Sequence, residues 1–153
     1  MDPTPPLPRV RVAALVTRGD SLLLVRHEKS ETDQYWLVPG GGLHFGESME
    51  EAVRRELREE VRLSEVTLGG LAFAHDTIAP DGARHLVNLY FAVEAWSGEP
   101  AIGEDPVVAE VRFVPFDEIP GLRMFPAIQA PLTAYLHGGS GQAPYHGRLW
   151  VDK

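Results

Sequence analysis

The alternation of apolar and polar positions predicts strands near the start of the chain. Residues 10–16 are apolar and rich in β-branched side chains, and residues 21–25 repeat this pattern after the turn sequence of residues 17–20. Two such runs joined by a short turn are typical of a β-hairpin. We expect a polar loop over residues 28–34, followed by a short apolar run at residues 35–38.

The spacing of apolar residues changes from the period of a strand to that of a helix after the glycine run of residues 40–42. This spacing predicts a helix over residues 49–61. Ser48 fits its N-cap, and acidic residues follow in the first turn, where the helix dipole favours them. The other expected elements are strands over residues 66–75, 85–96, 111–114 and 146–151, a turn over residues 78–82, a loop over residues 97–106 and a second helix over residues 124–137 that contains Pro131. One mixed sheet with two helices indicates an α/β sandwich.

Composition and charge narrow the class of protein. The chain has 153 residues, 44% of them apolar, which suits one domain with its own core and excludes a disordered chain. Its 22 acidic and 14 basic residues leave a net charge of −8, which argues against a protein that binds nucleic acid through the phosphates. It has no cysteine, which excludes disulfides, a thiol nucleophile and a cysteine-ligated zinc site.

No segment of the sequence predicts a membrane anchor. Residues 1–8 are rich in proline without the apolar segment of a signal peptide, and no stretch approaches the ~18 apolar residues of a membrane span. We therefore expect a cytoplasmic protein with neither a membrane nor a nucleic-acid partner. Its expected parts are an N-terminal arm (residues 1–8), one domain (residues 9–137) and a flexible tail (residues 138–153), whose strand-like residues 149–151 offer a surface for a homodimer.

The predicted helix carries acidic residues on the face that should be buried. Its apolar stripe consists of Met49, Val53, Leu57 and Val61. Glu56 and Glu60 project into the same sector, and Glu59 lies beside Glu56 at the i,i+3 spacing of helix neighbours. Three carboxylates therefore crowd one edge of the buried face.

Like charges that are brought together and partly desolvated destabilise a fold unless something neutralises them. Arg55 can pair with one carboxylate, but a single arginine cannot balance three. A proton or a divalent cation can, and oxygen ligands suit Mg²⁺ or Mn²⁺. The alternative is that these glutamates are solvated and paired with the arginines of the same helix.

A glycine run, residues 40–42, comes just before the acidic helix. Glycines let the backbone approach a ligand and can turn carbonyl or N–H groups toward it, although a structural turn would also explain the run. Carbonyl oxygens complete metal shells, and N–H groups hold phosphate. Strand, glycine run and acidic helix together predict a metal–phosphate site.

These residues resemble the Nudix box, G-x5-E-x7-R-E-U-x-E-E-x-G-U, in which U is a bulky aliphatic residue. Gly41 is followed after five residues by Glu47, and seven more lead to Arg-Glu-Leu-Arg-Glu-Glu-Val at residues 55–61. Leu63 fills the last aliphatic position, and the preceding residues 36–41 are also typical of the family. With so many fixed positions, the chain is similar to Nudix hydrolases of the MutT type.

The resemblance implies the Nudix fold, an α/β/α sandwich around a mixed β-sheet, for residues 9–137. It implies hydrolysis of the pyrophosphate linkage in a nucleoside diphosphate joined to another group, with Mg²⁺ or Mn²⁺ as cofactor. Glu47 and Arg55 would support the carboxylates, with Arg55 orienting Glu56 or Glu59. The metal ligands it implies are Glu56, Glu59, Glu60 and the carbonyl of Gly40.

Two positions depart from the family pattern. Arg62 stands where relatives have the glycine that ends the helix, which leaves the helix end and the placing of Leu63 open. His44 stands where many relatives carry an acid. It is either a solvated loop residue or a contact for substrate phosphate.

The resemblance does not fix the general base or the substrate. We expect Glu56 as the base, with Glu104 as its competitor, because relatives often place an extra acid in this loop; Asp105 and Glu110 are rivals for that role. The short form most resembles MutT-type enzymes, so we expect a small nucleotide, a (deoxy)nucleoside triphosphate. Alternatives are ADP-ribose or a nucleotide sugar and, in other classes, a catalytically silent nucleotide-binding module or a metal-stabilised structural protein.

Overall fold

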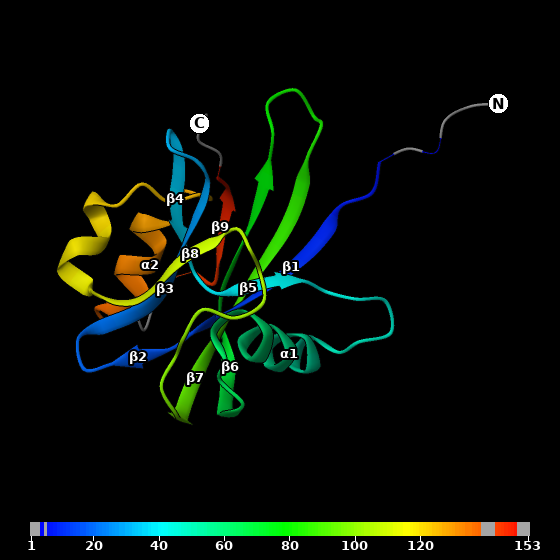
Figure 1. The fold of residues 1–153 in the computed structure, drawn as a ribbon. Helices are drawn as coiled ribbons and strands as arrows, with labels where there is room; N and C mark the ends of the chain where they lie inside the picture. Colours follow the sequence, from blue (N-terminus) through cyan, green and yellow to red (C-terminus); the bar gives the residue numbers. More distant parts are fainter. Residues whose placement is uncertain (1–3, 5, 139–142, 150–153) are drawn as a thin grey trace.

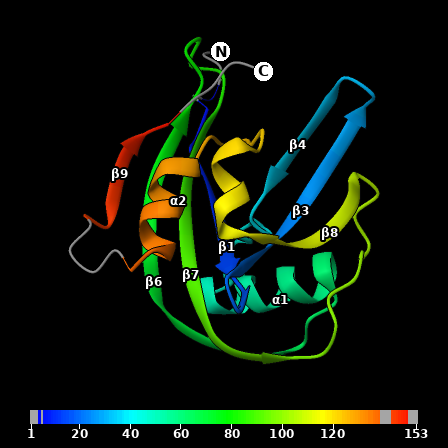
Figure 2. The same ribbon diagram turned by 90° about the vertical axis from the view of Figure 1, so that its left-hand side faces the viewer.

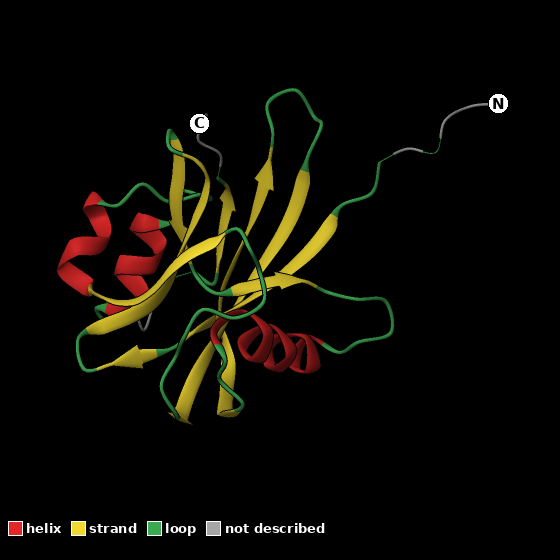
Figure 3. Ribbon diagram, in the orientation of Figure 1, coloured by secondary structure: helices red, strands yellow, loops and turns green. Residues whose placement is uncertain are grey.

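Two β-sheets packed between helices form the described part of the chain, which in this computed structural model is residues 4, 6–138 and 143–149 (Figures 1 and 3). The larger sheet is mixed, with strand order β5-β1-β7-β6-β9. In it β1 runs parallel to β7 and β6 parallel to β9, whereas the other pairs are antiparallel. Its strands are β1 (Arg9–Leu15), β5 (Gly40–Gly42), β6 (Glu65–Ile78), β7 (His85–Ser97) and β9 (Tyr145–Arg148).

The smaller sheet is antiparallel, and in it β3 pairs with three neighbours. Its strands are β2 (Thr17–Arg18), β3 (Ser21–Ser30), β4 (Asp33–Leu37) and β8 (Val108–Pro115). The helices are α1 (Met49–Val61), the 3-10 helix η1 (Phe116–Gly121) and α2 (Gln129–Leu136). Within the described residues, no helix is long and apolar enough to span a membrane.

Alternate residues of β1 and β3 pack against opposite helices, which explains why these strands read as continuous apolar runs. Val12 and Leu23 belong to the core cluster of α1, whereas Ala13 and Leu24 belong to that of α2. The two helices therefore lie on opposite sides of the β-strands (Figure 2). This arrangement confirms the expected α/β sandwich, built around two sheets rather than one.

Helix α1 has the bounds that the sequence predicts. The Ser48 hydroxyl accepts a hydrogen bond from the Glu51 N–H at 3.1 Å. The helix ends at Val61, because Arg62 adopts the left-handed conformation (φ 60°, ψ 33°), usually taken by glycine at this position. This costs about 1 kcal/mol, but the Arg62 side chain donates to the Ile102 carbonyl at 2.7 Å. The missing glycine therefore leaves the helix end intact, and Leu63 is buried.

The polar loop expected over residues 28–34 is wrong, because strand β3 continues to Ser30 and β4 begins at Asp33. Polar side chains hold this exposed end of the hairpin together. The Arg26 guanidinium donates to the Gln34 side chain at 2.9 Å, and Gln34 in turn donates to Glu28 at 3.2 Å. The sequence pattern missed the strands because their cross-strand contacts are polar here.

The second helix is shorter than the expected 124–137. Met124 forms a parallel bridge with Trp36, and the Phe125 N–H donates to the Trp36 carbonyl, so this segment extends the smaller sheet. The helix starts only at Gln129, which puts Pro131 in its first turn, where a missing N–H leaves no bond unmade. The 3-10 helix η1 was not expected from the pattern.

The strand expected near the C-terminal end is present as β9, parallel to β6. Beyond it, the Leu149 N–H donates to the Asp76 carbonyl at 2.8 Å. Residues 150 and 151, which belong to the expected dimer surface, lie outside the described residues. The homodimer and the division into arm, domain and tail stay predictions.

Candidate functional site

The glycine run forms strand β5, not a turn, and brings the sheet close to α1. A methyl group on Gly40 would lie 2.1 Å from the Val12 carbonyl oxygen. On Gly41 it would lie 2.4 Å from the carboxyl group of Glu56. Both distances are far below van der Waals contact. Gly40 is therefore required for β5 to pair with β1, whereas a side chain at Gly41 would displace the Glu56 carboxyl group from its place against β5.

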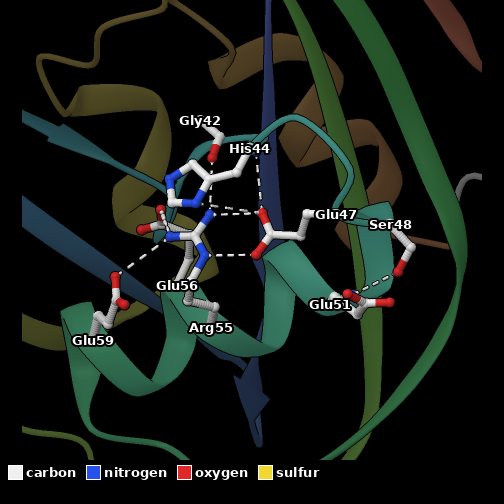
Figure 4. A network of polar contacts seen from close by, with 8 residues as sticks. All are labelled: Gly42, His44, Glu47, Ser48, Glu51, Arg55, Glu56 and Glu59. Carbon is white, nitrogen blue, oxygen red and sulfur yellow. Dashed lines mark hydrogen bonds and ion pairs between the residues drawn. The ribbon is translucent and has the colours of Figure 1, made fainter.

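Arg55 lies at the centre of the polar network beside β5 (Figure 4). Its Nε and Nη2 atoms donate to the two carboxylate oxygens of Glu47, at 2.7 and 2.9 Å. Its Nη1 donates to Glu56 at 2.8 Å and to Glu59 at 3.4 Å, and Nη2 also donates to the Gly42 carbonyl at 3.0 Å. The structure therefore brings together the four charged residues that sequence analysis assigned to this network.

The Arg55–Glu47 pair is bidentate, the strongest geometry for a guanidinium and a carboxylate. Hydrogen bonds from Arg55 lower the pKa of Glu47 to about 2, so Glu47 is ionised at neutral pH. Its charge and that of Arg55 cancel. Glu56 and Glu59 therefore share a guanidinium whose positive charge Glu47 has already balanced.

Glu60 is almost completely buried, with 6% of its surface exposed. The Gly40 N–H donates to its Oε1 atom at 3.2 Å. Burial raises the pKa of Glu60 to about 7, reinforced by the neighbouring Glu56 and Asp105 carboxylates and opposed by Arg11. The idea that all these glutamates are simply solvated does not fit Glu60.

The segment after β7 is fastened to the C-terminal end of α1. The N–H groups of Ala101, Gly103 and Glu104 donate to the carbonyls of Val61, Glu60 and Glu59 at 3.0, 3.0 and 2.9 Å. These bonds satisfy carbonyls that a helix end leaves without partners. A methyl group on Gly103 would lie 1.9 Å from the Glu59 carbonyl oxygen, so close docking requires glycine. The sequence did not predict that Gly103 permits this docking, because a glycine in a loop is common and was the only indication.

The docked segment forms one wall of a cleft of about 330 Å³, and α1 lines the cleft beside it. The cleft is lined by Glu56, Glu59, Glu60, Glu104, Asp105 and Pro106. No basic side chain is among these lining residues. Five carboxyl groups around one cleft, with oxygen as the donor atom throughout, fit a hard divalent cation such as Mg²⁺ or Mn²⁺.

Two other candidates lie outside the cleft lining. Glu110 is on β8, where its carboxylate accepts a hydrogen bond from Arg26 at 3.2 Å. His44 is exposed at the rim, and its Nδ1 atom lies 4.0 Å from Glu47. Of the proposed loop acids, Glu104 and Asp105 are therefore the ones that the fold places beside the box glutamates.

Comparison with known proteins identifies the family of the chain. The family profile described as NUDIX domain matches residues 7–136. A Methanocaldococcus jannaschii protein named ADP-ribose pyrophosphatase is 28% identical over 115 residues, which cover 75% of this chain and 66% of that protein. A Mesorhizobium japonicum protein named RNA pyrophosphohydrolase is 37% identical over 87 residues, which cover 52% of this chain and 49% of that protein. The matches thus span about half to two thirds of these relatives' lengths.

Solved structures share the fold. The crystal structure of a MutT NUDIX hydrolase from Burkholderia pseudomallei matches with a TM-score of 0.66 at 28% identity, over 73% of this chain and 86% of that one. The chain belongs to the NUDIX family, as its box residues indicated.

Replacing Gly103 by alanine should displace the loop that carries Glu104 and Asp105, because the new methyl group would collide with a backbone carbonyl. We expect the free energy of unfolding to fall by about 2 kcal/mol and Mn²⁺ affinity to fall with it. Urea denaturation and Mn²⁺ titration measure the two effects. Gly70→Ala, on open strand surface, is the control. Unchanged stability and affinity in Gly103→Ala would show that the docking is unimportant.

The raised pKa of Glu60 predicts a pH dependence of stability in the absence of divalent ions. The Glu60 carboxyl group has a pKa of about 7 in the folded protein and of 4.5 in the unfolded chain, so the folded state keeps its proton to a higher pH. Stability is therefore highest below pH 4.5 for this group and falls as the pH rises through 7, by roughly 3 kcal/mol. Burial lowers the pKa of His75 to about 4, which adds a slope of opposite sign in every variant. Urea denaturation in EDTA between pH 5 and 8 should therefore show the fall as a difference: the stability of wild type and of the exposed-site control Glu50→Gln declines relative to that of Glu60→Gln. The same slope in all three proteins would contradict the assignment.

Proposed function

We propose that the chain is a divalent-metal-dependent pyrophosphohydrolase that cleaves a nucleoside diphosphate linked to another group between two of its phosphates. The observation that carries the proposal is the cleft itself, in which three glutamates of one helix meet two loop acids. Arg55 does not neutralise this cluster because it forms a bidentate pair with Glu47. A silent binding fold would not need every box carboxylate in place.

Glu56, Glu59 and Glu60 would hold the cation, and the Gly40 carbonyl would add a ligand from β5. When bound, Mg²⁺ or Mn²⁺ neutralises phosphate charge and lowers the pKa of a water molecule. Glu60 has to release its proton for this role, since a carboxylate binds metal in its ionised form. Glu47 and Arg55 keep Glu56 and Glu59 oriented, which reduces the reorganisation that the reaction requires.

The reaction is attack of water on one phosphorus with cleavage of the bridging P–O bond, which yields two phosphorylated products. We assign the general base to Glu56, which accepts the proton of the attacking water. Its carboxylate is fixed from two sides, by the hydrogen bond from Arg55 and by close contact with Gly41. Glu104 is the competing base, because it lines the same cleft on a separate segment.

For the substrate we propose a (deoxy)nucleoside triphosphate or a related small nucleotide. The likeness to a MutT NUDIX hydrolase at 28% identity supports this choice. ADP-ribose is the second candidate, because a relative that matches three quarters of the chain is named ADP-ribose pyrophosphatase. The relative named RNA pyrophosphohydrolase adds triphosphorylated RNA ends to the substrates that need testing, although we expected no nucleic-acid partner.

A hydrolysis screen with Mg²⁺ and with Mn²⁺ tests the function. The panel contains nucleoside triphosphates, ADP-ribose, nucleotide sugars, dinucleoside polyphosphates and a short 5′-triphosphorylated RNA. We expect nucleoside triphosphates to be cleaved to a nucleoside monophosphate and pyrophosphate in equal amounts, and no cleavage in EDTA. Binding of nucleotides without turnover of any panel member would instead indicate a silent binding module.

The two candidate bases are distinguished by matched substitutions. Glu56→Gln should lower kcat by about 10³-fold, whereas Glu104→Gln should lower it by less than tenfold, because a base replaced by a neutral isostere can no longer accept the proton. Single-turnover rates at saturating Mn²⁺, with circular dichroism as a check of folding, measure the difference. Near wild-type turnover of Glu56→Gln, or a larger loss in Glu104→Gln, would reassign the base.

A further inference from the structure

One side of the acidic cluster contains a histidine that the Nudix box does not include. His27, Glu60 and Asp105 each offer a ligand atom, and these atoms lie within 4.8 Å of one another. The three residues come from separate elements, β3, α1 and the segment before β8. No sequence spacing announces the group, because the fold alone brings them together.

The position of His27 is set by the sheet. Leu23 and Val25, at alternate positions of β3, belong to the core cluster of α1, so His27 continues this row on the side of α1. The pairing of β3 with β8 has an irregularity at this point, where Arg26 pairs with Glu110 but His27 with Val108. The extra residue, Ala109, lies on β8, so β3 keeps its alternation up to His27. Bulges are frequent next to functional sites.

Asp105 is fixed by its own backbone. Its side chain accepts a hydrogen bond from the Val107 N–H at 3.0 Å, and its carbonyl accepts one from the Val108 N–H at 3.1 Å. The preceding N–H, that of Glu104, is bonded to the Glu59 carbonyl. Asp105 is thus held between the end of α1 and the start of β8, facing the buried Glu60.

We propose that His27, Glu60 and Asp105 form a mixed nitrogen–oxygen cation position that prefers Mn²⁺ or another first-row transition ion to Mg²⁺. It lies beside the all-oxygen position of Glu56 and Glu59, with Glu60 shared between the two. The inference rests on the proposed function, because it assigns the metal preference of that same site.

Ligand chemistry supports the preference. Imidazole nitrogen suits transition ions, whereas Mg²⁺ strongly favours oxygen, and affinity for a mixed donor set rises along the first transition row. Donors bonded at about 2.1–2.2 Å lie at most ~4.4 Å apart across one ion. The ligand atoms of His27, Glu60 and Asp105 all lie within 4.8 Å of one another, which is close to this limit. Two carboxylates near a single imidazole also leave a net negative charge for the ion to balance.

The direct test is pulsed electron paramagnetic resonance of the full chain loaded with Mn²⁺. A coordinated imidazole gives a nitrogen modulation of the electron spin echo, which an all-oxygen site does not. We expect this modulation in the wild type and in His44→Gln, whose histidine is at the rim of the site, and we expect its loss in His27→Gln. Its absence from the wild type, or its loss in His44→Gln alone, would overturn the proposal.

Equilibrium titrations give a second readout. His27→Gln should bind Mn²⁺ about tenfold more weakly than wild type and Mg²⁺ within a factor of two; equal Mn²⁺ affinities would overturn the proposal. Circular dichroism shows whether His27→Gln is folded. If it is not, the presence or absence of nitrogen modulation in the wild-type electron paramagnetic resonance spectrum decides whether the proposal holds. Wild-type hydrolysis with Mg²⁺ is measured in parallel. Turnover without nitrogen modulation rejects the His27 position and keeps the proposed function. Nitrogen modulation without turnover of any nucleotide rejects the proposed function and keeps the His27 position.

Discussion

The bidentate ion pair between Arg55 and Glu47 determines how the rest of the site behaves. It fixes the guanidinium in one orientation and cancels its charge, while the remaining Nη1 hydrogen bonds still orient Glu56 and Glu59. The carboxylates are therefore ordered without being neutralised. Carboxylates that are already ordered and whose negative charge is not neutralised can bind a cation with little rearrangement, because folding has already brought them together.

The fold maintains this crowding through contacts that leave no room for side chains. Gly41 allows the carboxylate of Glu56 to lie against β5, and Gly103 allows the loop before β8 to dock on the last carbonyls of α1. The same docking completes the hydrogen bonds of the helix end and delivers Glu104 and Asp105 to the cleft. Structural and chemical demands thus coincide at the C-terminal turn of one helix.

The sequence predicted those parts of the site that depend on local spacing. The bounds of α1 and the inward direction of Glu60 follow from a period of 3.6 residues, its cap follows from the residue type of Ser48, and all three are found in the structure. Met49, which the same period placed in the buried stripe, is exposed because it lies in the first turn of the helix. The Nudix box identified the family, because it too lies within one continuous segment.

What sequence analysis could not supply depends on long-range packing. The approach of Gly103 to α1 and the meeting of His27 with Asp105 join segments far apart in the chain. The polar hairpin of β3 and β4 and the late start of α2 were missed for a related reason. In the hairpin, the cross-strand hydrogen bond between Arg26 and Gln34 overrode the local pattern. Before α2, the long-range contact of Phe125 with Trp36 did so.

If the carboxylates of α1 and its docked loop form a divalent cation site, Mn²⁺ should occupy the cleft. Anomalous diffraction from crystals soaked in Mn²⁺, recorded on both sides of the manganese absorption edge, locates the ion. We expect a manganese peak in the cleft, about 2.2 Å from carboxylate oxygens of Glu56, Glu59 or Glu60. A cleft without a peak at saturating Mn²⁺, in crystals whose site is free of lattice contacts, would contradict the account.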